Sequence, residues 1–268
     1  MGFQRPPKKS RKADGFQPPL RSALNGNKFQ SQGVNMREVI ITDLTRFSTD
    51  ENVCTAVIDV NTGECLRPMP YLKSATCQEL GIHPGAILKG NLNLKPNSEN
   101  PHVEDASYSN LMFHGACSGE KFLQVLETSL SDSVSEGFGV DFGNNQKYIP
   151  HDQVANCSII TIKISPNQLS IHEDRYKPGK IKATFTDSSG HMYSYLSITD
   201  RGFHDYAKEH QNDGKLHEVT ELIKEQESVY LRIGLSRIWA VGDRNGFWLQ
   251  VNGIYTFPKF HEEIRSYG

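Results

Sequence analysis

The stretch between residues 230 and 252 combines side chains that suit a flat, negatively charged ligand. Aromatic rings stack on nucleic-acid bases at ~1–3 kcal/mol per base, and arginine adds phosphate and cation–π contacts. The alternative is that the rings fill a core and the arginines form a solvated rim. Because tryptophan is usually largely buried, at least one of the two tryptophans should be structural. The candidate set is Tyr230, Arg232, Arg237, Trp239, Arg244, Trp248, Gln250 and Asn252.

A second group of polar residues lies in the first half of the chain, at the ends of expected strands. Arg46 and Arg67 are candidates for phosphate binding, because the guanidinium group recognises phosphate in a bidentate manner. The competing interpretation, which we favour, is that Arg67 forms an ion pair with Glu104 or Asp105 and stabilises the fold at that point.

His102, Glu104 and Asp105 belong to the pattern H-x-E-D. On a strand, His102 and Glu104 would share one face and Asp105 would lie on the other. Two convergent ligands are too few for a metal site, and none of the motifs GxSxG, HExxH, GxxxxGK[ST] or GxGxxG occurs. We therefore expect no metal, no cofactor and no catalytic residue. Whether the cluster is functional or structural stays open at this point.

The composition indicates an ordinary globular protein. Hydrophobic residues make up 37% of the 268 residues, and no apolar run approaches the ~18–20 residues of a membrane span. The charged N-terminus lacks the apolar segment of a secretory signal. The five cysteines are an odd number without a CxxC pair, which is typical of reduced thiols in a cytosolic protein. We expect a soluble, cytoplasmic protein that does not contact a membrane.

The net charge of −2 is distributed unevenly along the chain. Residues 1–30 carry seven basic residues and one acidic residue, a net charge of +6, without apolar periodicity. We expect residues 1–34 to be a disordered basic tail, either an arm that holds nucleic acid or a solvated tail. Residues 31–159 carry 8 basic and 16 acidic residues, a net charge of −8, and residues 160–268 carry 14 of each. The acidic part would repel phosphate.

Two successive parts of the chain predict the same order of elements, β-β-β-α-β-β. In the first, TCQELGI predicts a short helix that ends at Gly81. In the second, GKIKATFTD and HMYSYLSI flank SSG and predict a hairpin, and Thr199 or Asp200 should cap the helix that follows. Between the two parts, GEKFLQVLETSLSDSVSEGF predicts one amphipathic helix. Strands are expected at 37–44, 53–60, 65–70, 86–94, 102–109, 157–164, 179–187, 191–198, 228–238 and 245–257.

Five strands with a helix between the third and the fourth is the order of the OB-fold, a partly open Greek-key barrel. We therefore predict a mainly β protein with two OB-like five-stranded barrels joined by a helical segment. The expected parts are a tail (1–34), a first barrel (35–110), a helical connector (111–156), a second barrel (157–258) and a C-terminal tail (259–268).

The last expected strand, NGFWLQVNGIYTF, should close the second barrel. Alternation places Phe247, Leu249 and Val251 on the inner face, and Trp248, Gln250 and Asn252 on the outer face. Two Asn-Gly pairs, at 245–246 and 252–253, supply turn or bulge chemistry.

Residues 37–70, REVIITDLTRFSTDENVCTAVIDVNTGECLRPMP, resemble the opening of the bacterial dual OB-containing domain family. The matching features are Thr45–Arg46, Cys54–Thr55–Ala56 and Arg67–Pro68, and HVED and RIGLSR…WLQVNGIYTFP are similar to later motifs. The loop STDEN at 48–52 departs from the basic, Gly-containing loop of the family, which argues against a phosphate contact there. The resemblance covers most of residues 36–258 and implies a nucleic-acid or nucleotide binder in a bacterial conflict or defence setting.

Three hypotheses follow from these observations. The first is a binding protein for nucleic acid, with a single strand favoured, or for a nucleotide, in which the tail captures the ligand and a barrel face stacks on it. The second is a protein-interaction adaptor that offers the aromatic face of the second barrel to a protein partner. The third is an enzyme that uses His102, Glu104 and Asp105, and the missing nucleophile and metal motifs favour the other two.

Overall fold

The structure is a computed structural model that describes residues 36–47, 51–261 and 264. The predictions for residues 1–34, for 48–50 in the STDEN loop and for most of the C-terminal tail lie outside the described residues. Residues 35–268 form one compact unit. The fold is mainly β, with two sheets and a few short helices, as predicted.

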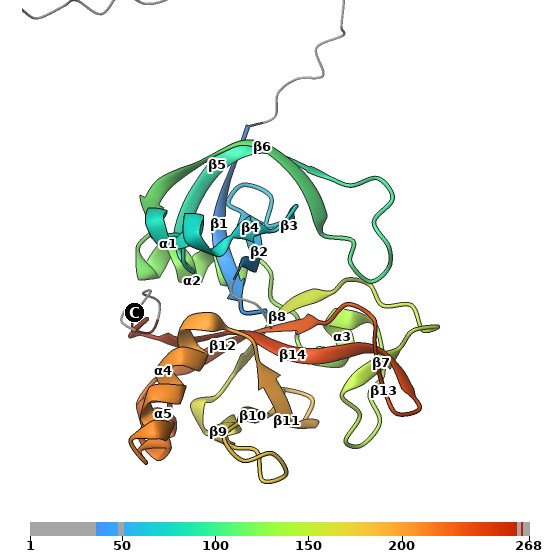
Figure 1. Cartoon of the computed structure of the whole chain (residues 1–268), viewed down its shortest axis with the longest axis vertical. Helices are drawn as coiled ribbons and strands as arrows, with labels where there is room; N and C mark the ends of the chain where they lie inside the picture. The colour runs from blue at the N-terminus through green and yellow to red at the C-terminus, as the bar shows by residue number, and fades with distance from the viewer. Residues whose placement is uncertain (1–35, 48–50, 262–263, 265–268) are drawn as a thin grey trace, which may run out of the picture. The chain divides into compact units, whose positions relative to one another are not determined.

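The first sheet closes into a barrel with the strand order of an OB-fold. β1 pairs with both β2 and β5, and β3 pairs in parallel with β6, so the ring runs β1-β2-β3-β6-β5. These elements run from blue to green in Figure 1. The short β4 extends the edge of β2. The strands are β1 (Met36–Thr45), β2 (Asn52–Asp59), β3 (Cys65–Met69), β4 (Leu72–Lys73), β5 (Ala86–Leu94) and β6 (Asp105–Ala116).

The predicted helix between the third strand and β5 is α1 (Ser74–Leu80). It ends where expected, at Gly81, which adopts the left-handed conformation with φ 66°. Glycine takes up this conformation without steric cost, and its N–H reaches the free carbonyl groups of the last turn. The chain is thereby turned directly into β5.

The second sheet repeats the ring. β11 pairs in parallel with β14, and β12 links β14 to β8. β8 and β9 are consecutive segments separated by the 3-10 turn Pro166–Gln168, so together they act as the first strand of the barrel. The predicted hairpin is formed by β10 and β11. The strands are β8 (Ile159–Ile164), β9 (Leu169–Glu173), β10 (Ile181–Thr186), β11 (Met192–Ile198), β12 (Ser228–Leu235) and β14 (Arg244–Phe257).

Two helices connect the third and fourth strands of the second barrel, α4 (Arg201–Asn212) and α5 (Leu216–Lys224). Asp200 caps α4, as predicted, because its side chain accepts a hydrogen bond from the N–H of Phe203 at 3.2 Å. Both helices bury one apolar side against the barrel, and Phe203, Val219 and Ile223 belong to its core.

The turn before β14 lies earlier in the chain than the Asn245–Gly246 pair, which was expected to supply a turn or a bulge. Val241 pairs with Arg244, so Gly242 and Asp243 form the turn between β13 (Trp239–Val241) and β14. Gly246 lies inside β14, where a Cβ atom would stand 2.1 Å from the carbonyl oxygen of Ile149 on β7 (Tyr148–Pro150). Close approach of a neighbouring strand therefore explains this glycine. The hairpin that β13 forms with the start of β14 was not predicted.

The helix predicted for GEKFLQVLETSLSDSVSEGF is two helices. α2 (Gly119–Glu127) is followed by a break, and α3 (Val134–Phe138) begins with its own cap at Ser133. The reason is that the break is held by another strand, since the N–H of Ser131 donates to the carbonyl of Thr161 on β8 at 2.8 Å. The tertiary contact overrides the helical periodicity.

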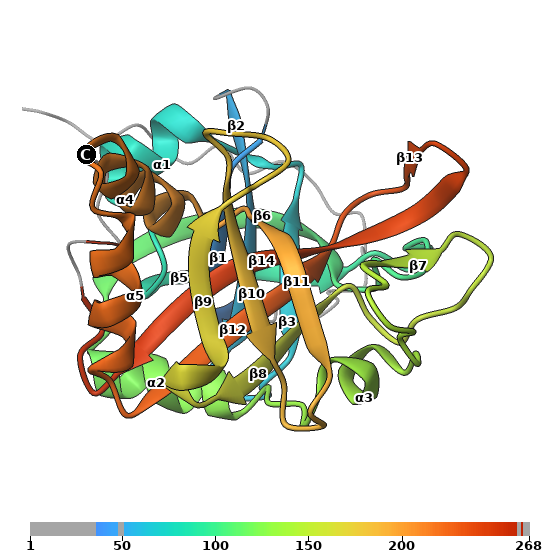
Figure 2. The same ribbon diagram turned by 90° about the horizontal axis from the view of Figure 1, so that it is seen from below.

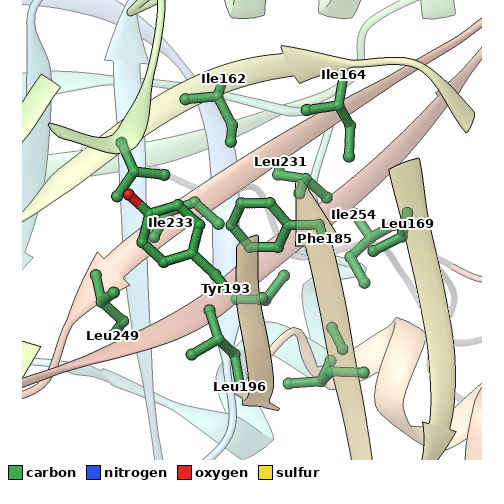
Figure 3. Packing of buried hydrophobic residues seen from close by; sticks show 14 of the residues in the cluster. Ile162, Ile164, Leu169, Phe185, Tyr193, Leu196, Leu231, Ile233, Leu249 and Ile254 are labelled. Atoms are coloured by element: carbon green, nitrogen blue, oxygen red, sulfur yellow. The ribbon is translucent and has the colours of Figure 1, made fainter. Parts of the chain in front are cut away.

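Each barrel has its own apolar core, and a third apolar cluster joins them. Figure 3 shows part of the larger core, inside the second barrel, where Phe185 and Tyr193 stack at 5.2 Å. The joining cluster gathers Ile40 and Ile58 of the first barrel, Phe122 of α2, and Tyr255 and Phe257 of β14. Because one cluster draws on both barrels and α2, the barrels and the connector pack as one body. No described helix is long and apolar enough to cross a membrane.

Candidate functional site

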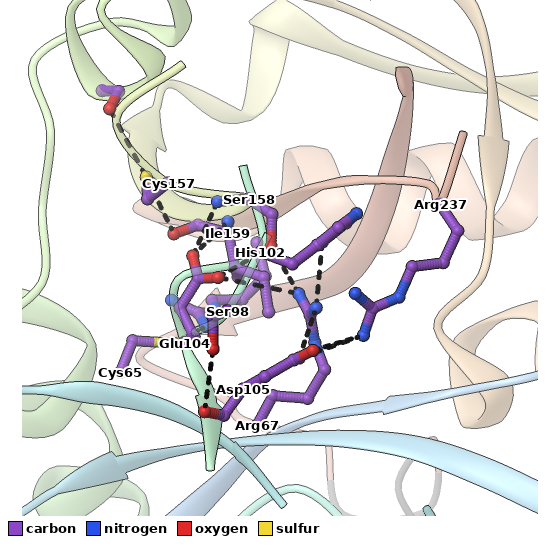
Figure 4. Close-up of polar contacts among 12 residues, drawn as sticks. Cys65, Arg67, Ser98, His102, Glu104, Asp105, Cys157, Ser158, Ile159 and Arg237 are labelled. Atoms are coloured by element: carbon purple, nitrogen blue, oxygen red, sulfur yellow. Dashed lines mark hydrogen bonds and ion pairs between the residues drawn. The ribbon is translucent and has the colours of Figure 1, made fainter. Parts of the chain in front are cut away.

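The predicted polar residues of the first barrel form a buried network rather than an open site (Figure 4). Arg67 is only 3% exposed and forms an ion pair with Asp105 at 3.1 Å. Its other Nη donates to the hydroxyl group of Ser158 in the second half of the chain at 2.5 Å. Glu104 accepts hydrogen bonds from the N–H groups of Ser158 and Ile159, at 2.6 and 3.0 Å. The predicted ion pair of Arg67 is thus confirmed within the first barrel. The hydrogen bonds of Arg67 and Glu104 to Ser158 and Ile159 tie the two barrels together.

His102 and Glu104 are not on a strand, which corrects the interpretation of H-x-E-D. The turn that follows the cis Asn100–Pro101 peptide holds both residues, and β6 begins at Asp105. All three side chains therefore converge on Arg67 instead of alternating across a sheet. Arg67 donates to Nδ1 of His102 at 3.0 Å. Burial, together with the positive charges of Arg237 and Arg67, lowers the pKa of His102 to about 3, so the ring is neutral.

Arg232 and Tyr230 were predicted to bind a ligand, and the structure does not bring them to a surface. The Arg232 side chain is fully buried, and its Nε donates to Asp43 of β1 at 2.8 Å. Its Nη1 donates to the hydroxyl group of Thr161 at 2.8 Å. Tyr230 is buried in the cluster that joins the barrels, and its hydroxyl group donates to Glu127. We call the contacts of Arg232 and Asp43, together with those of Arg67 and Glu104, the polar joint.

The other predicted residues, apart from Arg244, gather around one cavity of about 510 Å³. We call it the inter-barrel cavity, because Thr45 to Phe47 after β1 line one side and Ser236 to Trp239 after β12 line the other. Arg67 and His102 of the polar joint form part of its lining. The remaining predicted residues that line it are Arg46, Arg237, Trp239, Trp248, Gln250 and Asn252.

Asn252 reaches this cavity through a bulge, one of the two features, turn or bulge, expected for the Asn252–Gly253 pair. Arg232 pairs with Gly253 and Ile233 pairs with Val251, so Asn252 is an extra residue in β14. Its Oδ1 accepts a hydrogen bond from the hydroxyl group of Thr199 at 2.8 Å. The bulge turns the amide side chain into the cavity and fixes its orientation.

The two tryptophans differ in their surroundings. Trp248 is half-buried, stacks on Tyr148 at 5.0 Å and donates from Nε1 to the carbonyl of Trp239 at 2.9 Å. Trp239 lies on β13 and is 66% exposed. Trp248 is therefore the structural tryptophan that the sequence led us to expect, and Trp239 is available to a ligand or partner.

A second hollow, of about 490 Å³, lies on the other side of Trp248 and Gln250, which line both. It covers the outer side of β10 and β11 and the loop 174–180, with Arg244 at its edge. We call it the β10–β11 face; Figure 2 shows these strands side by side, with the β13 hairpin extending beyond them. Its aromatic lining residues are Tyr176, Tyr195 and Trp248, and its charged ones are Lys147, Asp174, Lys177, Lys182 and Arg244.

Tyr195 occupies a strained backbone conformation within β11. Its φ is 58°, in the left-handed region that a bulky side chain rarely adopts. The pairing of β10 with β11 slips by one residue at this point, so Tyr195 belongs to a bulge. Its ring lies within 5.4 Å of the Lys147 ammonium and 5.3 Å of the Arg175 guanidinium. Backbone strain that displays one aromatic ring among cations is typical of a binding site.

The cations of the β10–β11 face outnumber its carboxylates. Burial lowers the pKa of Lys147, and the positive charges of Lys182 and Arg244 lower it further against the opposing effect of Asp174. Burial also lowers the pKa of Lys182. Asp174 is 3.9 Å from Lys182 and is the one carboxylate in the lining. The face consequently holds unneutralised positive charge that an anion would stabilise.

Most residues of the β10–β11 face were not among the binding residues predicted from the sequence. The loop EDRYKPGKIK, residues 173–182, joins the first two strands of the second barrel and contains four cations, a tyrosine and a Pro-Gly turn. That composition next to a strand of an expected OB-fold is the signal that could have identified it, because this loop contributes to ligand binding in OB-folds. Lys147 and Tyr195 carry no comparable signal. Among the described residues, no group of His, Cys, Asp and Glu could hold a metal ion.

Comparison with known proteins places these observations in a family context. Among solved structures, a murine DNA-binding protein bound to double-stranded DNA is similar at 8% sequence identity and a TM-score of 0.28. That match covers 84% of this chain and 97% of the other, and a similarity this weak carries no argument. No curated protein matches the chain. A family model described as the dual OB-containing domain matches residues 39–254.

Proposed function

Because the chain belongs to the dual OB-containing domain family, we propose that it binds nucleic acid as a single strand on the β10–β11 face. The observation that supports this most directly is the composition of that hollow, with three aromatic rings and four cations against one carboxylate. In OB-folds the second and third strands and the adjacent loops bind oligonucleotides and oligosaccharides. β10 and β11 are those strands in the second barrel.

The charge of the face favours an oligonucleotide over an oligosaccharide. A neutral sugar offers nothing to a group of cations, whereas each phosphate neutralises one of them and releases counterions. Lys147 and Arg244 have no carboxylate partner within 4.0 Å in the part of the chain that the structure describes. These two cations are therefore available to phosphate groups.

The aromatic side chains favour a single strand over a duplex. Tyr176 is 72% exposed and lies at the mouth of the face beside Arg175, whose guanidinium is 4.8 Å from its ring. An exposed ring can stack on an unpaired base at ~1–3 kcal/mol, but the bases of a duplex are already stacked on one another. The basic residues of 1–30 would add non-specific attraction for either form.

Fluorescence anisotropy of labelled single-stranded DNA and RNA, with duplexes of the same sequence, tests the proposal on the full-length protein. We expect single strands to bind more tightly than duplexes, and expect binding to weaken steeply with salt. Tyr176→Ala should lose ~1–3 kcal/mol of binding free energy, whereas Tyr176→Phe should retain it because stacking uses the ring face.

A companion variant separates the barrel from the tail. In it, glutamine replaces the seven basic residues of 1–30, and it should bind more weakly but keep the preference for single strands and the effect of Tyr176→Ala. If binding disappears with the tail charges and Tyr176→Ala changes nothing in the unaltered protein, the face does not bind nucleic acid.

A second candidate is a protein-interaction adaptor, and one observation favours it. Ile238, Trp239 and Val241 on and beside β13 are all exposed apolar side chains on a projecting hairpin. Exposed apolar groups of this kind can mark a protein contact. An adaptor should capture its partner with little dependence on salt. Ile238→Ser should weaken the complex without changing strand binding on the β10–β11 face, because Ile238 does not line that face.

A further inference from the structure

The inter-barrel cavity is a separate hollow from the β10–β11 face, and most of its lining belongs to neither the face nor the apolar cores. We propose that it is a binding site for one nucleoside monophosphate group, either a free nucleotide or the end of a strand. The inference does not depend on the proposed function, because different residues would carry it.

The size and position of the cavity suit a small ligand. Its volume of about 510 Å³ lies within the ~300–1,000 Å³ that small-molecule sites occupy. Its two sides come from different barrels, the end of β1 in the first and the loop after β12 in the second. The polar joint holds these two parts together, so the cavity is preformed.

Aromatic side chains line the cavity on both sides. Phe47 and Tyr71 come from the first barrel, with ring centroids 5.0 Å apart. Trp239 comes from the second barrel and is mostly exposed. A planar ring between these walls would be in apolar contact on both of its faces, which is the environment that proteins provide for an unpaired base.

Amide groups lie where a base edge could be read. Asn252 is fixed by its bond from Thr199, and that leaves its Nδ2 available as a donor. The Gln250 side chain makes no hydrogen bond within the described part of the chain, and it lines the same cavity. Side-chain amides provide both donors and acceptors, and they match the mixed edge of a nucleobase better than a charged side chain does.

The charges around the cavity match a single phosphate group. Arg237 is bound to Asp105, at 3.0 and 2.9 Å from its two oxygens, and Arg67 shares that carboxylate. Arg46 instead donates to the ring of His204, at 2.6 Å from Nε2, and has no carboxylate within 4.0 Å among the described residues. The charge of this guanidinium group is thus not neutralised by a carboxylate of the described residues, and arginine binds phosphate in a bidentate manner.

His102 provides independent support for an anion here. It lines the cavity and remains neutral because it is buried beside Arg67 and Arg237. A neutral imidazole with Nδ1 as an acceptor from Arg67 keeps its proton on Nε2, as a donor. Burial is the main cause of this low pKa, and the positive charges of Arg237 and Arg67, which add to it, would attract a phosphate group.

Isothermal titration calorimetry of the full-length protein tests the proposal with the 5′-monophosphates of adenosine, guanosine, cytidine and uridine. The unphosphorylated nucleosides and inorganic phosphate serve as separate ligands. We expect at least one monophosphate to bind more tightly than its nucleoside and than inorganic phosphate. Arg46→Gln should weaken that binding about tenfold or more and leave the nucleoside unchanged. Trp239→Ala should weaken both, and Trp239→Phe should restore them.

A matched control distinguishes the cavity from the β10–β11 face. Arg175→Gln also removes one exposed guanidinium, but beside the face, so it should leave monophosphate binding unchanged while weakening any strand binding. If Arg175→Gln and Arg46→Gln weaken a bound monophosphate equally, or if a monophosphate binds and Arg46→Gln does not weaken it, the inference is overturned. Loss of strand binding alone would affect only the proposed function.

The source of the nucleotide is decided by a parallel titration with oligonucleotides that carry a 5′-phosphate, a 3′-phosphate or neither. If free monophosphates do not bind but Arg46→Gln weakens only an end-phosphorylated strand, the site takes a strand end. If Arg46→Gln changes the affinity neither for free monophosphates nor for end-phosphorylated strands, the proposal fails.

Discussion

The two barrels share one strand order but use equivalent parts differently. In the first barrel, the connection between the fourth and fifth strands contains His102 and Glu104, and it is bound to Ser158 and Ile159 at the start of the second barrel. In the second barrel, the equivalent connection is the projecting hairpin with Trp239. One loop holds the structure together and the other is open to solvent. A shared fold therefore does not indicate a shared role.

The third strands show the same contrast. β3 carries Arg67, which is buried in the polar joint, whereas β11 carries Tyr195, which a bulge displays beside cations. The buried charges of the first barrel are neutralised within the protein, whereas the cations of the β10–β11 face outnumber its one carboxylate. This difference leads us to assign stability to one region and binding to the other.

The largest effect should come from breaking the polar joint. Arg232→Met should lower the free energy of unfolding by ~3–5 kcal/mol, because it leaves Asp43 buried without its partner. Chemical denaturation monitored by circular dichroism measures this change. Arg175→Met, on the surface of the second barrel, should change it by less than about 0.5 kcal/mol. A loss below ~1 kcal/mol in Arg232→Met would show that the joint does not hold the barrels.

The second-largest effect should be a loss of folding stability at acidic pH, and it is caused by His102 of the polar joint. The pKa of His102 falls from 6.5 to about 3 on folding. Below pH 6.5, His102 is therefore protonated in the unfolded chain but stays neutral in the folded chain until the pH approaches 3. Stability is therefore present above pH 6.5 and is lost as the pH falls towards 3. Between pH 7 and pH 5 the protein should lose about 2 kcal/mol more than His102→Asn, at 1.36 kcal/mol per pH unit.

Denaturation curves of the protein and of His102→Asn at the two pH values provide the comparison. The variant keeps an acceptor near Arg67 but cannot titrate. If both lose the same stability between pH 7 and pH 5, His102 does not carry the acid sensitivity of the joint.

A smaller effect concerns the backbone of the β10–β11 face. At an ordinary strand position, glycine is less stable than alanine by roughly 0.5–1 kcal/mol. At Tyr195, where φ is 58°, the order should be reversed, with Tyr195→Gly more stable than Tyr195→Ala by ~1 kcal/mol. Both should lose strand binding. Thermal unfolding measures the pair, and the usual order, with alanine the more stable, would show that no strain is stored here.

The smallest effect is on the salt dependence of binding. Lys147→Gln should reduce the slope of log K against log salt concentration for a single strand by ~0.7, the contribution of one phosphate contact. Lys224→Gln removes an equal charge from α5, where Glu221 is 3.1 Å away, and it should leave the slope unchanged. Equal slopes for the two variants would exclude a phosphate contact at Lys147.

Local patterns were sufficient to predict most of the elements and the inner face of β14. Turn and cap residues such as Gly81 and Asp200 act within a few positions of themselves, so the sequence shows them directly. Alternation placed Phe247, Leu249 and Val251 inside the barrel, and all three are buried. Where a distant contact acts on a local pattern, as the Thr161 carbonyl does on the break between α2 and α3, the prediction of a single helix was wrong.

The sequence by itself therefore determined the order of the two successive barrels and indicated an irregularity at Asn252–Gly253 and an ion pair of Arg67 with Glu104 or Asp105, because these depend on periodicity, turn chemistry and opposite charge. Only the tertiary structure decided which arginines are available. Arg232 and Arg46 look alike in the sequence, yet one is buried against Asp43 and the other lines the inter-barrel cavity. The physical reason is that burial depends on which residues of the other barrel lie opposite, and packing between barrels brings together residues almost 200 positions apart.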